Sequence, residues 1–178
     1  MPDPSALMKR EDVIASLWPK DAPPFSKTWV ILDCARDERI LGAIEKSRRE
    51  KCCLFAGELS YQVRQVAPHL VHLEPGDGLA RFIIERGWGN SWGIFFTSNG
   101  SLDTLRKHFR KFLRVSGPDG RNLLFRYYDP RVLRTFLPTC GTADLTQLFG
   151  AVDRFMAETE DGAGTKQYAF NGRALTGS

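Results

Sequence analysis

The chain has 178 residues and a mass of 20.1 kDa, and 42% of its residues are hydrophobic, 26% charged and 11% aromatic. This balance is typical of a globular protein, and it excludes a disordered tail, a collagen-like fibre and a small disulfide-rich scaffold. The net charge of +4 arises from 25 Lys and Arg against 21 Asp and Glu, and it indicates little about partners until its distribution is known.

The first fifty residues predict a helix, a linker, a buried strand and a second helix. Residues 5–18 carry one apolar face at helical spacing, and residues 21–27 contain two prolines and form a linker. Residues 28–33 (TWVILD) are continuously apolar, as in a strand covered on both faces. Residues 35–50 predict a helix. The apolar side chains of these two helices are Leu7, Val13, Ile14 and Leu17, then Ile40, Leu41 and Ile44.

Two more strands and two more helices are predicted before residue 100. Residues 58–66 form a short helix that Pro68 stops, and residues 69–73 (HLVHL) form a strand. A PGDG turn precedes a helix over residues 79–86. Residues 92–97 (WGIFFT) are the next strand.

The best-marked helix covers residues 101–114, with Ser98 or Ser101 as its cap. Its buried stripe consists of Leu102, Leu105, Phe109, Phe112 and Leu113. After an SGPDG turn, residues 122–128 (NLLFRYY) predict a strand that Asp129 and Pro130 close. Two short helices (131–137 and 144–149) and two short strands (153–158 and 166–170) follow.

Together these elements predict an α/β protein with a mixed β-sheet of about five strands, helices packed on it and a single main domain. Residues 1–27 are expected to form an N-terminal helix and linker, and residues 28–150 the α/β domain. Residues 151–178 are expected to form a short, hairpin-like C-terminal extension with a frayed tail.

The positive charge is concentrated in residues 101–134, which hold nine basic and three acidic residues and leave the rest of the chain at −2. Five of the basic residues lie on the helix face opposite the apolar stripe: Arg106, Lys107, Arg110, Lys111 and Arg114. This face is either a docking surface for an acidic partner or for phosphates, or an ordinary solvated face whose cations suit the helix C-terminus.

The segment FRYYDPR, residues 125–131, is the densest group of polar and aromatic side chains. Asp129 can cap the helix that Pro130 begins, and Arg131 can pair with Asp129 or Asp33. The sequence therefore favours a structural network over a substrate site. Its members are Arg126, Tyr128, Asp129, Pro130 and Arg131.

Trp88 and Trp92 flank glycines in the segment GWGNSWG, and they can be either core residues or anchors for a partner. These glycines precede a strand, whereas the glycines of a dinucleotide-binding loop follow one. His69 and His72 lie on opposite faces of a predicted strand and make a poor metal pair. We therefore predict no catalytic residue, no metal and no cofactor.

The cysteines and the N-terminus indicate the cellular compartment of the protein. Cys34, Cys52, Cys53 and Cys140 form no CxxC pair, and the start MPDPSALMKR lacks the order of a signal peptide. No apolar run approaches the roughly 18 residues of a membrane span. The sequence predicts a cytoplasmic protein that does not enter a membrane.

Several motifs, taken in order, resemble one known family. They are WVILDCA (29–35), LFAGE (54–58), APHLVHL (67–73), GWGNSWGIFFTS (87–98), LRKHFRKFLRV (105–115) and LLFRYYDPRVLRTFLP (123–138). This order is similar to that of the effector adaptor or chaperone family of bacterial type VI secretion systems, long described as a domain of unknown function. The resemblance covers about residues 28–150.

The resemblance implies a non-enzymatic adaptor that binds a toxic effector and helps to load it onto the spike protein VgrG. Binding specificity would then come from aromatic anchors and complementary charge. On this interpretation the partner-binding residues are Arg106, Lys107, Arg110, Lys111, Arg114, Trp88 and Trp92.

Two other functions compete with this one. A nucleic-acid-binding module would use the basic helix at 101–114, although no helix-turn-helix partner and no RNP-like strand accompany it, so nucleic acid is not the expected partner. An enzyme for a phosphorylated substrate would use the Arg, Tyr and Asp side chains of residues 126–131, but the sequence offers no credible nucleophile or general base.

Overall fold

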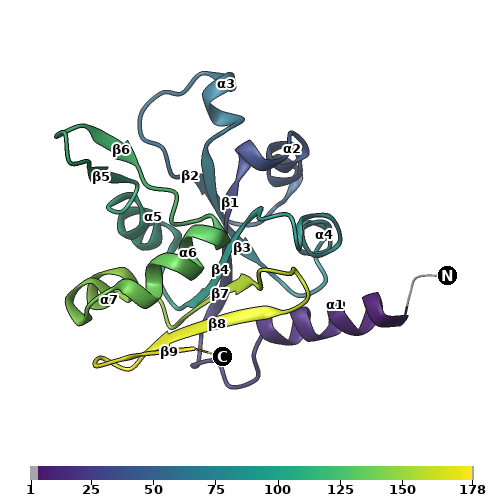
Figure 1. Ribbon diagram of the computed structural model, residues 1–178. Helices are drawn as coiled ribbons and strands as arrows, with labels where there is room; N and C mark the ends of the chain where they lie inside the picture. Colours follow the sequence, from purple (N-terminus) through teal and green to yellow (C-terminus); the bar gives the residue numbers. More distant parts are fainter. Residues whose placement is uncertain (1–3, 178) are drawn as a thin grey trace.

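The computed structural model describes residues 4–177, and the side chains from residue 10 to residue 177. In this part of the chain, seven strands form one sheet in the order β2-β3-β1-β4-β7-β8-β9, with each neighbouring pair antiparallel (Figure 1). The strands are β1 (Lys27–Asp33), β2 (Lys51–Cys53), β3 (Pro68–Leu73), β4 (Gly93–Ser98), β7 (Arg154–Glu158), β8 (Thr165–Phe170) and β9 (Leu175–Gly177). A separate hairpin consists of β5 (Arg114–Ser116) and β6 (Asn122–Leu124).

The predicted α/β class and single domain are confirmed, but the sheet has seven strands rather than about five, and its pairings are antiparallel rather than mixed. The short strands β2 and β9 have three residues each, too few for a recognisable alternation. Residues 122–128, predicted as one strand, contribute only β6. The tail predicted to fray contains β9, which pairs with β8.

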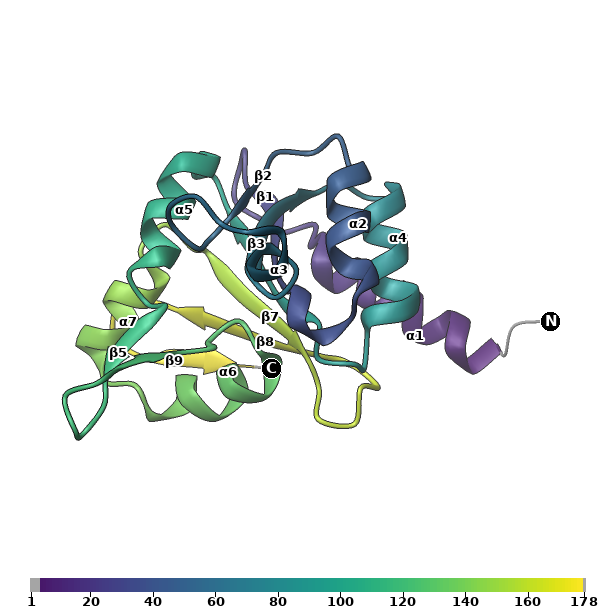
Figure 2. The ribbon, with the colours of Figure 1, turned by 90° about the horizontal axis from the view of Figure 1, so that it is seen from above.

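Helices cover both faces of the sheet and make a three-layer structure (Figure 2). One face carries α1 (Pro4–Leu17), α2 (Arg39–Lys46) and α4 (Gly78–Phe82), which continues into the π-helical turn η2 (Ile83–Gly87). The other face carries α5 (Leu102–Arg110), α6 (Pro130–Phe136) and α7 (Thr142–Phe149). Three short elements complete the chain: the 3-10 turns η1 (Cys34–Arg36) and η3 (Leu137–Thr139), and the single-turn helix α3 (Tyr61–Arg64).

Strand β1 lies at the centre of this arrangement, paired with β3 on one edge and β4 on the other. Because side chains alternate along a strand, Trp29 and Ile31 enter the core under α5, α6 and α7, whereas Val30 and Leu32 enter the core under α1, α2 and α4. All four side chains are at most 1% exposed. The continuous apolar run TWVILD is therefore the mark of a strand buried on both faces, as predicted.

Both terminal segments pack onto this body. In α1, Val13 and Leu17 are buried as predicted, but Ile14 is 43% exposed because it lies on the outer face. Leu7, also predicted on the apolar face of this helix, has a side chain outside the described part of the chain. At the other end, β7 pairs with β4, so the strands within residues 154–177 extend the main sheet.

The predicted helix over residues 35–50 is shorter in the structure. Asp33 accepts a hydrogen bond from the Ala35 N–H at 3.1 Å and so begins the turn η1, and α2 starts only at Arg39. In α5, Ser101 is the cap, since its hydroxyl accepts from the Thr104 N–H at 3.2 Å. Local capping by short polar side chains therefore sets the starts of η1 and α5.

The close approach of β4 to β1 requires a glycine at position 93. A Cβ there would collide with the Ile31 carbonyl oxygen and lie 3.1 Å from the Leu32 Cα. These are backbone atoms of a central strand, which cannot move aside without opening the sheet. We predict that Gly93→Ala lowers the free energy of unfolding by about 1–3 kcal/mol or more.

Chemical denaturation measures this loss, and Gly42→Ala is its matched control. A Cβ at Gly42, within α2, would meet nothing within 4 Å. Alanine should therefore raise the free energy of unfolding there by up to about 1 kcal/mol. Equal stability of the two variants would contradict the proposed close approach.

Candidate functional site

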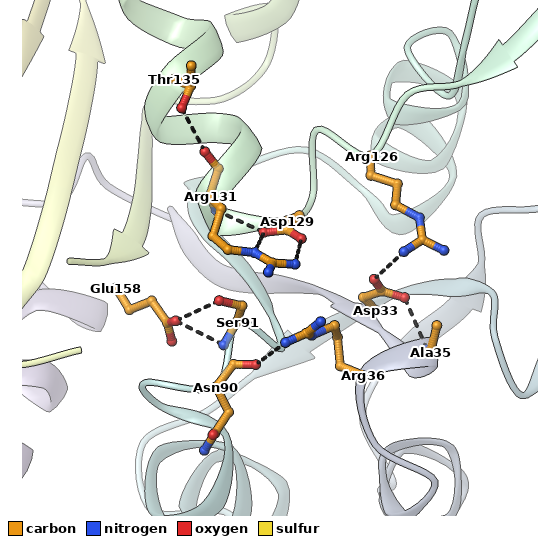
Figure 3. A network of polar contacts seen from close by, with 10 residues as sticks. All are labelled: Asp33, Ala35, Arg36, Asn90, Ser91, Arg126, Asp129, Arg131, Thr135 and Glu158. Carbon is orange, nitrogen blue, oxygen red and sulfur yellow. Dashed lines mark hydrogen bonds and ion pairs between the residues drawn. The ribbon is translucent and has the colours of Figure 1, made fainter. Parts of the chain in front are cut away.

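The segment FRYYDPR begins α6 and supports its first turn (Figure 3). Asp129 accepts a hydrogen bond from the Arg131 N–H at 2.9 Å, and Pro130 occupies the first helical turn. The Arg131 guanidinium returns to the Asp129 carboxylate with bonds of 3.0 and 2.6 Å. The cap that the sequence suggested for Asp129 is therefore present, as is its pair with Arg131.

A second carboxylate, Asp33, lies at the end of β1 opposite this turn (Figure 3). Its side chain is fully buried, and the nearest cation is Arg126, whose Nη1 lies 3.8 Å from Oδ2. Oδ1 accepts from Ala35, but Oδ2 has no hydrogen-bond partner among the described residues. Burial raises the pKa of Asp33 above its ordinary value of 3.8, because the cation beside it is too distant and too exposed to offset desolvation.

The loop before β4 is held by a residue that the sequence did not single out, Glu158 of β7. Its carboxylate accepts from the N–H groups of Gly89 and Ser91 at 2.7 and 2.9 Å, and from the Ser91 hydroxyl at 3.1 Å. Arg36 donates to the Asn90 carbonyl in the same loop at 3.2 Å (Figure 3). No sequence motif marks Glu158, since the strand and the loop meet only in the fold.

The two tyrosines of the motif are buried side by side. The Tyr127 hydroxyl donates to the Phe109 carbonyl at 2.9 Å, which ties the segment to α5. Tyr128 is 1% exposed, and burial raises its pKa to about 12. Both phenols therefore stay protonated near neutral pH. Tyr128 joins the packing of the core, in keeping with the structural role predicted for it.

The basic face predicted on residues 101–114 is smaller in the structure than in the sequence. Arg110 is half-buried and donates to the carbonyl oxygens of Leu54 and Phe55 at 2.9 and 3.0 Å, so it ties α5 to the segment after β2. Arg106 and Lys107 both pair with Asp103, at 2.6 and 2.7 Å.

Lys111 and Arg114 remain as exposed cations at the end of α5 and the start of β5. Within the described chain neither forms an ion pair. Of the five predicted contacts on this face, these two are the most available to a partner.

The two tryptophans have different surroundings. Trp92 is 3% exposed, and its ring packs 5.2 Å from the ring of Phe82, so it is a core residue and offers no side-chain surface to a partner in this conformation. A Cβ on Gly87 would collide with this indole, so the glycine makes room for it. Trp88 is half-buried against Phe95, with ring centroids 5.5 Å apart.

The hairpin of β5 and β6 extends from the body beside α5 and exposes apolar side chains (Figures 1 and 2). Val115, Leu123 and Leu124 are 42, 48 and 45% exposed. The register places Val115 opposite Leu123, and Arg114 opposite Leu124. Exposed apolar groups beside unpaired cations are typical of a surface that contacts another protein. We call Lys111, Arg114, Val115, Leu123 and Leu124 the hairpin surface.

One cysteine and one histidine are in contact, with Cys34 Sγ 3.3 Å from His69 Nδ1, but both side chains are buried and offer no access to a substrate. Burial lowers the pKa of His69, His72 and His108, and the His108 ring is hydrogen-bonded to the Leu148 carbonyl at 2.8 Å. Burial raises the pKa of the Cys34 thiol to about 12. Within residues 4–177, no three His, Cys, Asp or Glu side chains form a group that could hold a metal ion.

The raised pKa of Asp33 predicts a dependence of stability on pH. Near pH 4 the folded protein binds a proton at Asp33 more readily than the unfolded chain does, so protonation favours the folded state. This contribution to stability is lost as the pH rises through the raised pKa. The variant Asp33→Asn has no titratable group at this position, so it does not lose stability in this way as the pH rises. Its stability relative to the unchanged protein should therefore be higher at pH 7 than at pH 4.

Urea unfolding at the two pH values measures this difference. Asp119→Asn, at an exposed turn position, is the control. An advantage of Asp33→Asn that does not change with pH would contradict the assignment.

Removal of the cap of α6 should also lower stability. Burial acts to raise the pKa of Asp129, but the hydrogen bonds from Arg131 outweigh it and leave the pKa below its ordinary value. Asp129→Ala should lower the free energy of unfolding by about 1 kcal/mol while leaving a folded protein. Asp129→Asn keeps a cap oxygen and should lose less; equal losses in thermal unfolding would show that capping is not its role.

None of the helices in residues 4–177 combines the length and the apolar character that a membrane crossing needs.

Comparisons with known proteins identify the family of this chain. Neither the search of the curated proteins nor that of the solved structures gave a match. The family model described as "Domain of unknown function (DUF4123)" matches residues 28–147, more than half of the chain. The chain therefore belongs to the DUF4123 family, the effector adaptor and chaperone family of type VI secretion systems that its motifs resemble.

Proposed function

We propose that this protein is a non-enzymatic adaptor that binds one toxic effector in the cytoplasm of the producing cell and promotes its loading onto the spike protein VgrG. The observation that carries this proposal is the family match over residues 28–147. The polar network around Asp33, Asp129 and Glu158 supports a structural role, because each of its three carboxylates accepts hydrogen bonds from backbone N–H groups.

The hairpin surface is the contact for the effector in this proposal. Its apolar side chains provide area that a partner can bury, and Lys111 and Arg114 favour an acidic region of that partner. Trp88 is a further candidate contact because it is only half-buried. Arg106, Lys107 and Arg110 contribute less, since they already hold Asp103 or backbone carbonyl groups.

The nucleic-acid alternative has less support. A phosphate-binding helix needs several free cations along one face, whereas three of the five on this face are engaged within the protein. The remaining pair lies beside exposed leucine side chains, which suit a protein partner better than a phosphate backbone.

Deletion of the gene tests the function in the cell. The strain should stop secreting the one effector whose gene neighbours this one, while it still secretes the tube protein of the same apparatus. A tagged copy should co-purify with that effector or with VgrG. Unchanged secretion of every effector, together with no such complex, would overturn the proposal.

The hairpin surface generates a more specific prediction. Replacing Leu123 and Leu124 together with serine should weaken effector binding about tenfold, or roughly 1.4 kcal/mol. The fold should persist, because both side chains are exposed. Isothermal titration calorimetry measures the affinity, with circular dichroism as the check on folding. The double variant Lys20→Glu/Arg173→Glu, at two exposed positions outside this surface, is the control.

A further inference from the structure

A groove lies on the opposite side of the sheet from the hairpin surface. It has a volume of about 930 Å³ and runs between α2 and α4, which lie side by side (Figures 1 and 2). Its floor includes Gly42 and Ala43 from α2, and Leu79 and Phe82 from α4. The floor is therefore mostly apolar.

The groove is open because small residues line both helices. The large side chains of α2, Ile40, Leu41 and Ile44, point into the core. Gly42 lies between Leu41 and Ile44 in the sequence, and a Cβ built on it would meet nothing within 4 Å. The same holds for Gly78 of α4. The open space is thus a property of the two helix faces and not of a displaced loop.

The rim of the groove is positively charged. It carries Arg39, Lys46, Arg48 and Arg49 against one acid, Asp77. Arg49 pairs with Asp77 at 3.2 Å, and Arg39 pairs with Asp37 outside the groove. Lys46 and Arg48 are exposed and form no ion pair within the described chain. This patch lies in the part of the chain outside residues 101–134, which carries a net charge of −2.

The arrangement of apolar and charged groups indicates the kind of occupant. A small-molecule pocket usually aims a few buried polar groups at its ligand. Here the cations lie at the rim, with the side chains of Arg39 and Arg49 56 and 38% exposed. Asp77 is the least exposed charged group, and it is occupied as the cap of α4, where it accepts from the Ala80 N–H at 2.6 Å.

We propose that the groove binds an acidic amphipathic helix of a partner protein. The apolar stripe of that helix lies on Ala43, Leu79 and Phe82, and its carboxylates meet Lys46 and Arg48. The inference rests on the proposed adaptor function, because an adaptor needs separate surfaces for two partners. The hairpin of β5 and β6 lies on the opposite side of the sheet from α2 and α4 (Figure 2), so two partners can bind at the same time.

The test uses a synthetic peptide of 18 residues with leucines at helical spacing on one face and glutamates elsewhere. A peptide of the same composition in scrambled order is the control. Fluorescence anisotropy with the full chain should give saturable binding of the first peptide, at least tenfold tighter than the scrambled one, and weaker in high salt. Equal binding of both peptides, or none, would overturn the proposal.

Two groove variants locate the binding. Lys46→Glu/Arg48→Glu reverses the rim charge, and Gly42→Gln fills the floor from a position with free space. Each should weaken binding of the peptide at least tenfold. The variants Leu123→Ser/Leu124→Ser and Lys20→Glu/Arg173→Glu should leave it unchanged. Binding that the groove variants do not weaken would refute the assignment.

Three further outcomes separate this proposal from others. If the chain forms a dimer in sedimentation experiments and the groove variants abolish it, the occupant is a second copy and the proposal fails. If deletion leaves effector secretion unchanged but the peptide binds as described, the adaptor function fails and the groove stands. If secretion requires the protein but the peptide does not bind, only the groove assignment fails.

Discussion

Strand β1 is hydrogen-bonded on both edges and covered on both faces, and the other elements are arranged around this strand. An apolar strand of this kind cannot face water on either side, so helices must pack above and below it. The three-layer structure follows from that requirement. It places α2 and α4 on one outer surface, and α5 with its hairpin on the other (Figure 2).

The same strand ends in a buried charge. Asp33 follows the last apolar residue of β1 and starts the turn η1, where it faces Arg126 from the segment before α6. A buried carboxylate with a distant partner weakens the fold, yet the contact joins parts of the chain more than ninety residues apart in sequence. Nearby, Asp129 caps the first turn of α6 and Glu158 of β7 holds the loop before β4 (Figure 3).

A body with two separate outer surfaces suits the proposed adaptor function. Interfaces gain affinity when the bound geometry already exists in the free protein, because less conformational entropy is lost on binding. Around the core, several of the exposed apolar side chains lie in short elements, among them the hairpin of β5 and β6. This distribution separates the residues that maintain the fold from those that can contact a partner.

The sequence by itself determined the elements that depend on neighbours along the chain. These are the buried run of β1, a serine cap for α5, which the structure assigns to Ser101 of the two candidates, and the start of α6 at Asp129 and Pro130. Capping and periodicity act over a few residues, so the amino acids alone predict them. The ordered motifs likewise predicted the family, which the family model confirms.

Only the tertiary structure decided which side chains remain available at the surface. Arg110 looked like a surface cation, but it is bound to carbonyl oxygens of a segment more than fifty residues away. Trp92 is enclosed by η2 and α4, Glu158 meets its loop from β7, and the groove forms where α2 and α4 bring Gly42 and Gly78 into one lining. Each of these depends on contacts between distant segments, and burial and hydrogen bonding there are set by the packing of the whole chain.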